Sequence, residues 1–192
     1  IFSVKNALDY LGFENKLTDK KEDIEKADAI ILPGVGAFPW AMNMLGLSGL
    51  IDTIKEQAKI KPFLGICLGM QLLFEKSYEF EECKGLGLIG GYVDKINEPD
   101  LVIPHMGWNS LDFYGSSPLF EGLSDHPYVY FVHSYYAVPK NNDIIAAKTR
   151  YCGDLTVSIH DKNIVATQFH PEKSGDAGLR ILKNFVDMGG ER

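Results

Sequence analysis

Gly65-Ile66-Cys67-Leu68-Gly69 is the stretch that decides the fold, because a strand pattern ends within it and a helix pattern begins. The apolar run 63–66 predicts a buried strand, and residues 68–74 predict a helix. At such a turn the backbone N–H groups lack intrahelical acceptors and favour a reactive thiolate. The pattern therefore predicts a cysteine version of the Gly-x-Ser-x-Gly nucleophile elbow, with the Leu68 N–H in an oxyanion hole. A buried structural cysteine is the alternative.

A histidine near the other end of the chain supplies the base that a nucleophilic cysteine needs. The segment Thr167-Gln168-Phe169-His170-Pro171-Glu172-Lys173-Ser174 follows an apolar run, 163–166, which predicts a strand. His170 is then at or just past a strand end, and Glu172 can bind its other ring nitrogen if the chain turns at Pro171. His-Pro-Glu alone is more often a surface turn. Together with the elbow, it predicts a Cys67-His170-Glu172 triad.

Both motifs resemble those of the class I, triad-type glutamine amidotransferases. The resemblance extends over nearly the whole chain through three further segments, which occur in the order found in that family: Leu32-Pro33-Gly34-Val35-Gly36-Ala37-Phe38, Pro104-His105-Met106-Gly107-Trp108-Asn109 and Tyr130-Phe131-Val132-His133-Ser134-Tyr135-Tyr136. The second segment narrows the resemblance to glutaminase subunits that serve imidazole glycerol phosphate synthesis in histidine biosynthesis.

The resemblance implies hydrolysis of the glutamine side-chain amide to glutamate and ammonia. The ammonia would pass to a (β/α)₈-barrel cyclase subunit, bound as a heterodimer, which makes imidazole glycerol phosphate and AICAR from PRFAR. We expect low glutaminase activity without that partner and strong stimulation by it, since a sealed interface protects free ammonia from protonation.

The resemblance also assigns roles to individual residues. The oxyanion hole is expected from the backbone N–H groups of Val35 and Leu68. Residues expected to bind glutamine are Gly34, Gly36, Gln71, His133, Ser134 and Tyr135. Residues expected to face the partner are His105, Met106, Trp108, Asn109 and Lys173. Taken alone, His133 is more often a satisfied structural histidine, Trp108 and Met106 are more often core, and Pro-Gly-x-Gly often simply ends a strand.

Alternating strand and helix patterns in the first half predict an α/β fold with one doubly wound, mostly parallel sheet flanked by helices. In such sheets ligands bind beyond the carboxyl ends of the strands, where Gly34, Cys67 and His170 would lie. Short strand patterns in the second half predict an antiparallel or mixed extension of the same sheet. We expect residues 1–192 to form one glutaminase domain. Family members begin with a strand before the helix predicted at 1–11, so we expect an N-terminal strand to be missing.

The composition excludes several classes of function. A net charge of −7 at pH 7 and alternating charge signs argue against nucleic-acid or anionic-membrane surfaces. The 3 cysteines have neither disulfide-framework nor zinc-site spacing. We therefore expect no metal, no cofactor and a cytoplasmic enzyme with reduced cysteines.

Three other functions compete with this interpretation. The chain could serve a different synthase, such as a sugar amidotransferase with a similar barrel. It could be a silent regulatory module of the same fold, although the complete triad argues against that. It could also be a cysteine hydrolase or peptidase, although Gln71 and the segment His133-Ser134-Tyr135 fit a small amino-acid pocket better.

Overall fold

The computed structural model describes residues 2–98 and 101–190. The helices are α1 (Phe2–Tyr10), α2 (Lys21–Lys26), α3 (Phe38–Ser48), α4 (Ile51–Gln57), α5 (Leu68–Leu72) and α6 (Gly175–Gly190), with 3₁₀ turns η1 (Pro118–Phe120), η2 (Asn142–Ile144) and η3 (Pro171–Lys173). The strands are β1 (Ile30–Gly34), β2 (Phe63–Cys67), β3 (Phe74–Ser77), β4 (Cys83–Lys84), β5 (Ile89–Lys95), β6 (His105–Ser110), β7 (Asp112–Phe113), β8 (Tyr128–His133), β9 (Tyr135–Pro139), β10 (Ile145–Arg150), β11 (Asp154–Asp161) and β12 (Ile164–Thr167).

The largest sheet has six strands in the order β1-β2-β12-β11-β10-β7. The first three strands are parallel, and the other three add in antiparallel pairs. The α/β class and the antiparallel extension of the main sheet are confirmed. The sheet is less parallel than expected, because only the β1·β2 and β2·β12 pairs run in the same direction.

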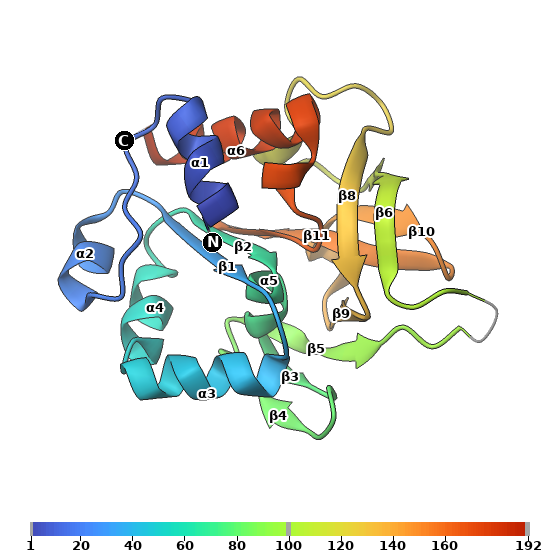
Figure 1. Ribbon diagram of the computed structural model, residues 1–192, viewed down its shortest axis with the longest axis horizontal. Helices are drawn as coiled ribbons and strands as arrows, with labels where there is room; N and C mark the ends of the chain where they lie inside the picture. Colours follow the sequence, from blue (N-terminus) through green and yellow to red (C-terminus); the bar gives the residue numbers. More distant parts are fainter. Residues whose placement is uncertain (1, 99–100, 191–192) are drawn as a thin grey trace.

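Helices cover both faces of the parallel strands, with α1 and α6 on one face and α3 and α4 on the other (Figure 1). Alternate residues of β2 point to opposite faces, as the pleat requires. Leu64 and Ile66 join the hydrophobic cluster that includes side chains of α1 and α6, whereas Phe63 joins the cluster under α3 and α4. This two-sided burial explains the continuous apolar run of β2, every residue of which is buried.

Two smaller sheets complete the fold and correct the prediction of a single sheet. One has the order β4-β3-β5-β9, and the other is the hairpin-like pair β6-β8. Residues 68–74 were expected to form a helix, but α5 ends at Leu72 and Phe74 begins β3. Short, fully apolar runs fit a buried helix and a buried strand equally well, so periodicity cannot separate them.

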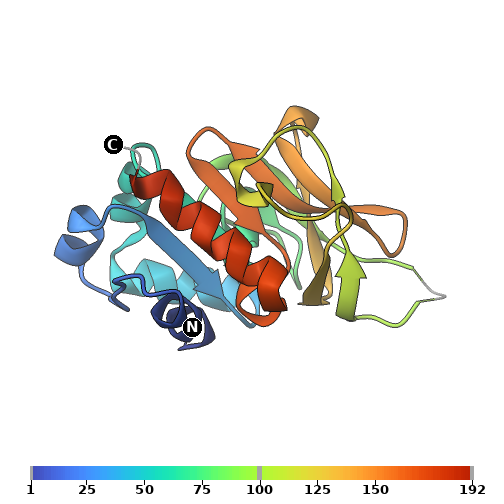
Figure 2. The same ribbon diagram turned by 90° about the horizontal axis from the view of Figure 1, so that it is seen from above.

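The pair β6-β8 lies at the end of the molecule opposite α2 and α4, and α6 crosses the sheet between these two ends (Figures 1 and 2). The edge strand β1 is half-buried along its length. Its carboxyl end lies beside that of β2, since Gly34 pairs with Cys67.

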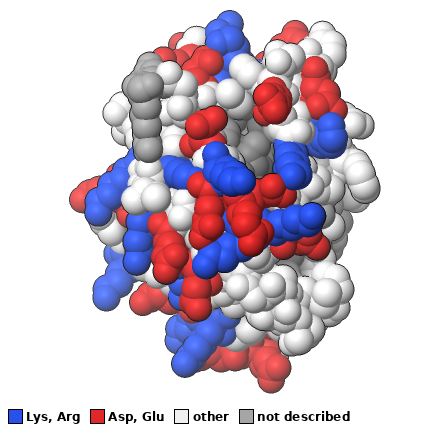
Figure 3. Space-filling model, turned by 90° about the vertical axis from the view of Figure 1, so that its left-hand side faces the viewer, with Lys and Arg blue, Asp and Glu red and all other residues white. Residues whose placement is uncertain are grey.

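Surface charge and helix length bear on two of the excluded classes. On the face shown in Figure 3, Lys and Arg side chains are interspersed with Asp and Glu and form no separate basic area. In the described ranges 2–98 and 101–190, none of the helices has the length and apolar character needed to span a bilayer.

Candidate active site

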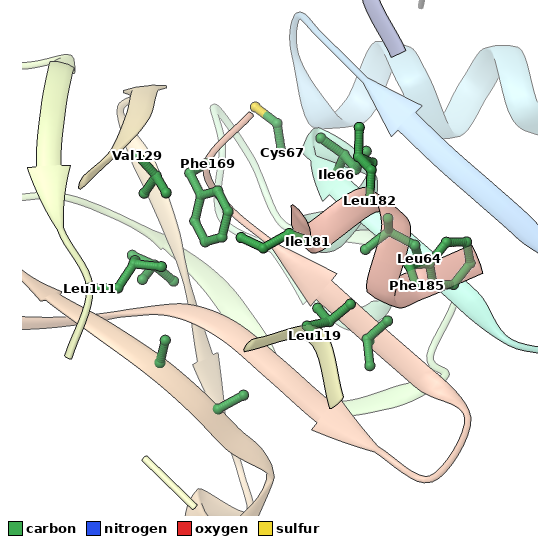
Figure 4. Packing of buried hydrophobic residues seen from close by; sticks show 14 of the residues in the cluster. Leu64, Ile66, Cys67, Leu111, Leu119, Val129, Phe169, Ile181, Leu182 and Phe185 are labelled. Carbon is green, nitrogen blue, oxygen red and sulfur yellow. The ribbon is translucent and has the colours of Figure 1, made fainter. Parts of the chain in front are cut away.

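Cys67 ends β2 with a backbone conformation that non-glycine residues rarely adopt, at φ 55° and ψ −113°. The next residue, Leu68, begins α5. The strand-to-helix turn therefore has the geometry expected of a nucleophile elbow, with backbone strain at the cysteine itself. The sulfur of Cys67 lies at the rim of the hydrophobic cluster and points away from Ile66 (Figure 4).

Glycines allow the elbow to pack directly against the neighbouring strand. A Cβ atom on Gly69 would lie 1.8 Å from the carbonyl oxygen of Leu32, and one on Gly34 would lie 2.9 Å from Cβ of Leu68. Neither position accepts a side chain without displacing backbone or the elbow. Gly34 was expected at the glutamine pocket, and the structure gives it a packing role against α5 as well.

The segment 34–36 begins at the carboxyl end of β1, beside the elbow. Gly36 has φ +97°, a conformation that favours glycine, and the Val35 side chain is 67% exposed. Because Gly34 pairs in register with Cys67, the Val35 backbone follows directly beside the sulfur-bearing turn. This position is compatible with the predicted pair of oxyanion donors, Val35 and Leu68.

His170 and Glu172 form a buried pair just beyond β12. Nδ1 of His170 lies 2.8 Å from Oε1 of Glu172, and the two side chains are 4% and 6% exposed. The turn η3 starts at Pro171 and places the carboxylate behind the ring, as the His-Pro-Glu spacing suggested. Because β12 pairs with β2, with Thr167 opposite Ile66, the histidine arrives on the strand next to Cys67.

Electrostatics at His170 favour the imidazolium. Burial lowers the pKa of His170, but interactions with Cys67 and Glu172 outweigh it and raise the pKa to about 9. Nε2, the ring nitrogen that does not bind Glu172, is buried and makes no hydrogen bond of normal geometry. Nε2 is thus free to exchange a proton with a reacting group.

Gln71 is buried one helical turn beyond Cys67, and its amide is already engaged. Nε2 of Gln71 donates to the carbonyl of Tyr135 at 3.1 Å and to Oε1 of Gln168 at 2.9 Å. Gln168, which is fully buried, in turn donates from Nε2 to Sγ of Cys67 at 3.7 Å. Sequence reasoning missed Gln168. The signal was available, since a glutamine directly after an apolar strand has to find buried partners.

The side chain of His133 is also used within the protein. It is buried, and its Nε2 lies 3.0 Å from Nδ1 of His105. His105 stacks between the rings of Phe131 and Tyr151, with centroids at 4.6 and 4.0 Å. His105 was expected at the partner interface, but burial excludes its side chain from direct contact in this structure. Alternation along β6 accounts for this placement, because adjacent residues of a strand face opposite sides.

Burial lowers the pKa of His105 and of His133 to about 4. For His133, the hydrogen bond with the Tyr135 carbonyl acts against this effect without cancelling it. Both rings are therefore neutral near pH 7, in contrast to His170.

The other face of β6 presents Met106 and Trp108 to solvent. Met106 is 65% exposed and Trp108 is 56% exposed. The Trp108 ring packs edge-on against Tyr130, and the ammonium group of Lys173 lies over the same Tyr130 ring at 5.9 Å. Lys173 is therefore continuous with this surface. Asn109 instead turns toward the protein, where its Nδ2 donates to the Arg150 carbonyl at 3.1 Å.

A pocket of about 440 Å³ brings together Ser134 and Tyr135, two of the residues expected to bind glutamine. Its lining also includes Glu79 and Lys95, so both charges that a zwitterionic amino acid needs are present. One oxygen of Glu79 accepts from the Phe38 N–H at 2.6 Å. Sequence reasoning did not single out Glu79 or Lys95, because neither lies in a recognisable motif. Among the described residues, no group of three His, Cys, Asp or Glu side chains is placed to hold a metal ion.

Comparisons with known proteins agree with this geometry. The family described as "Glutamine amidotransferase class-I" matches residues 2–188. The chain is 51% identical over 188 residues to "Imidazole glycerol phosphate synthase subunit HisH" of Listeria innocua, covering 97% of this chain and 89% of that protein. It is 48% identical over 186 residues to the protein of the same name from Bacillus mycoides, covering 96% and 88%.

A solved structure, "Crystal structure of glutamine amidotransferase", superposes with a TM-score of 0.77 at 23% identity, covering 98% of this chain and 93% of that one. This similarity shows the fold alone. Family membership is shown by the family match over residues 2–188 and by the sequence identity to the two subunits named above. The chain belongs to the class-I glutamine amidotransferase family.

Proposed function

We propose that this chain is the glutaminase subunit of an imidazole glycerol phosphate synthase in histidine biosynthesis. It hydrolyses the side-chain amide of glutamine and delivers ammonia to a synthase subunit. Full-length identities of 51% and 48% to proteins of that name support the assignment. The single structural observation that carries it is the buried His170–Glu172 pair on the strand beside the Cys67 elbow.

In the proposed reaction, the Cys67 thiolate attacks the carboxamide carbon of glutamine. Protonated His170 then gives its proton to the leaving ammonia, which is consistent with a pKa raised to about 9. Water, deprotonated by the same imidazole, cleaves the thioester and releases glutamate. Glu172 holds the ring orientation and stabilises the imidazolium.

The tetrahedral oxyanion would be bound by the backbone N–H groups of Val35 and Leu68. Loss of one such donor costs on the order of 3 kcal/mol in the transition state. Gly36 gives this segment the freedom to reorient, and we assign to it the switch between an idle and an active state. The pocket of Ser134 and Tyr135 would receive the amino-acid end of glutamine, with Glu79 and Lys95 as complementary charges. Gly34, Gly36, Gln71 and His133 are proposed to contribute to the same glutamine site.

The partner is proposed to be a (β/α)₈-barrel cyclase subunit, bound as a heterodimer over Met106, Trp108 and Lys173. Exposed Met and Trp side chains are typical of interface centres. His105 and Asn109 lie on the inner side of β6, and we propose that they support this interface from behind the exposed face. We further propose that residues 1–192 are a single cytoplasmic glutaminase domain, since β2 contributes to both hydrophobic clusters.

The test is ammonia and glutamate release from glutamine by the full-length protein, measured with and without the barrel subunit and its nucleotide substrate. We expect little activity from the protein alone, strong stimulation by the loaded partner, and none from Cys67→Ala. Full turnover without a partner would contradict the proposed coupling. Stimulation only by a sugar-amidotransferase barrel would favour the alternative synthase.

A further inference from the structure

Gln168 is a buried polar residue outside the triad whose side chain contacts the proposed nucleophile, Cys67. Its side chain is fully buried, and its amide nitrogen lies 3.7 Å from Sγ of Cys67, within the range of an N–H···S hydrogen bond. Its backbone N–H donates to the Val157 carbonyl at 2.8 Å, so the residue is anchored to β11. A buried amide with this contact can hold the sulfur in one position and stabilise negative charge on it.

The direction in which the Gln168 amide points is determined by its neighbour. Nε2 of Gln71 lies 3.1 Å from the backbone oxygen of Tyr135, which can only accept. The amide group of Gln71 must therefore present its nitrogen on that side, and the second N–H of the same nitrogen donates to Oε1 of Gln168 at 2.9 Å. With its oxygen held by Gln71, Gln168 turns its nitrogen toward Cys67.

The same carbonyl also orients the histidine pair. Nδ1 of His133 lies 2.9 Å from the Tyr135 oxygen and must carry a hydrogen. The neutral ring then accepts at Nε2, so Nδ1 of His105 is the donor in the 3.0 Å contact between the two rings. Nε2 of His105 is left as an acceptor, and Asn109 Nδ2 lies 3.4 Å from it.

These contacts form two branches of hydrogen bonds that meet at the Tyr135 carbonyl, which accepts from both Gln71 and His133. One branch ends at Asn109, on the strand that carries Trp108, and the other ends at the sulfur of Cys67. Because the Tyr135 carbonyl can only accept, the branch through Gln71 has one allowed polarity and holds the Gln168 amide in one orientation.

We propose that Gln168 is a positioning residue for Cys67, and that Gln71, oriented by the Tyr135 carbonyl, keeps the Gln168 amide donor directed at the sulfur. The inference rests on the proposed role of Cys67 as the nucleophile. In this proposal Gln168 positions the Cys67 sulfur before glutamine binds.

The experiment measures thiol reactivity, which does not require turnover. The full-length protein is treated with iodoacetamide at pH 7, and the alkylation rate of each of Cys67, Cys83 and Cys152 is followed by peptide mass spectrometry. Gln168→Met keeps the side-chain length and removes the donor. We expect Cys67 to react about tenfold more slowly, as loss of a hydrogen bond to a charged group implies. Cys83 and Cys152 are internal references and should keep their rates.

Gln57→Met, on α4, is the matched control and should leave all three rates unchanged. Gln71→Met leaves Gln168 in place but removes the donor that holds its side-chain oxygen. The alkylation rate of Cys67 should therefore fall in this variant too. The double variant should be no slower than Gln168→Met, because Gln71 acts through Gln168. His170, Glu172 and His133 are intact in every variant.

A wild-type rate at Cys67 in folded Gln168→Met would overturn the proposal. If that variant does not fold, Gln71→Met decides alone, and a wild-type rate there would likewise overturn it. Glutamine hydrolysis is assayed separately on the wild-type protein together with the barrel subunit and its nucleotide substrate. Absence of hydrolysis with normal alkylation effects would refute the proposed function while leaving the positioning role of Gln168 intact.

Discussion

Nδ1 of His170 and Oε1 of Glu172 lie 2.8 Å apart, and both side chains are almost completely shielded from solvent. In a site from which water is excluded, this carboxylate is the fixed negative charge that holds the ring in one orientation. The pair comes from residues two apart in the sequence, so a single turn, η3, builds it.

Replacing Glu172 by Gln should therefore lower partner-stimulated glutaminase activity by about 10²- to 10⁴-fold, because the amide can keep the contact but not the charge. Ammonia release with saturating glutamine measures this effect. Glu22→Gln, on the exposed surface of α2, is the control and should keep full activity. Activity within twofold of wild type in Glu172→Gln would contradict the orienting role.

The same pair sets the alkaline limit of activity. Burial lowers the pKa of His170, and Cys67 and Glu172 more than compensate, raising it to about 9. The imidazolium needed to protonate ammonia should persist up to that pH and be lost above it. In Glu172→Gln one of the stabilising charges is gone, so the alkaline limb should move to lower pH. An unchanged limb in the variant would show that another group controls it.

Stability should fall on the acid side of neutrality. His105 and His133 have their pKa lowered to about 4, chiefly by burial, so the unfolded chain binds more protons than the folded one between pH 6.5 and 4. Urea midpoints should drop as the pH falls from 6.5 to 5. The double variant His105→Phe/His133→Leu should show a flatter profile over this range, and an equally steep profile would exclude the pair as the cause.

The opposite sign applies to His170. Its pKa is raised in the folded state, so its stabilising contribution is fully present below about pH 6.5 and is lost as the pH rises through about 9. Urea midpoints between pH 7 and 9.5 should decline in the wild-type protein and decline less in His170→Asn. A steeper decline in the variant would contradict the sign.

The exposed face of β6 can be tested with a pair of tryptophans. Trp108→Ala should weaken binding of the barrel subunit by about 2 kcal/mol or more, as for a central interface residue, with little effect on stability. Trp40→Ala, on α3, is the matched control, since Trp40 is exposed to a similar degree. Titration calorimetry with the partner measures both. Equal losses, or a larger loss for Trp40, would move the proposed interface to α3.

Substitution by alanine should have opposite effects on stability at Gly69, in the elbow, and at Gly46, in α3. Gly69→Ala places a Cβ against the Leu32 carbonyl. We expect this substitution to lower the free energy of unfolding by about 4 kcal/mol, which is a large effect for a single substitution. Gly46→Ala in α3 meets no atom closer than 4.0 Å and should stabilise by about 0.5–1 kcal/mol. Thermal unfolding separates them, and a stable Gly69→Ala would mean that the elbow can shift.

The sequence predicted the parts of this structure that depend on local chemistry. The elbow at Cys67, the turn at Pro171 and the buried strand β2 follow from residue type and spacing alone. The strand β3 and the pair β6-β8 did not, because their pairing depends on contacts between distant segments. The burial of His105 was missed for the same reason, because the face of a strand that a side chain takes is decided by its partner strand.

The adjacency of β2 and β12 has a consequence for the newly made protein. The thiol is that of Cys67, whereas the imidazole and carboxylate proposed to activate it belong to His170 and Glu172, about a hundred residues later. During translation the sulfur is synthesised long before its base leaves the ribosome, so a nascent or prematurely terminated polypeptide holds an unactivated cysteine. Hydrolysis of the cell's glutamine cannot begin until synthesis of the domain is almost finished.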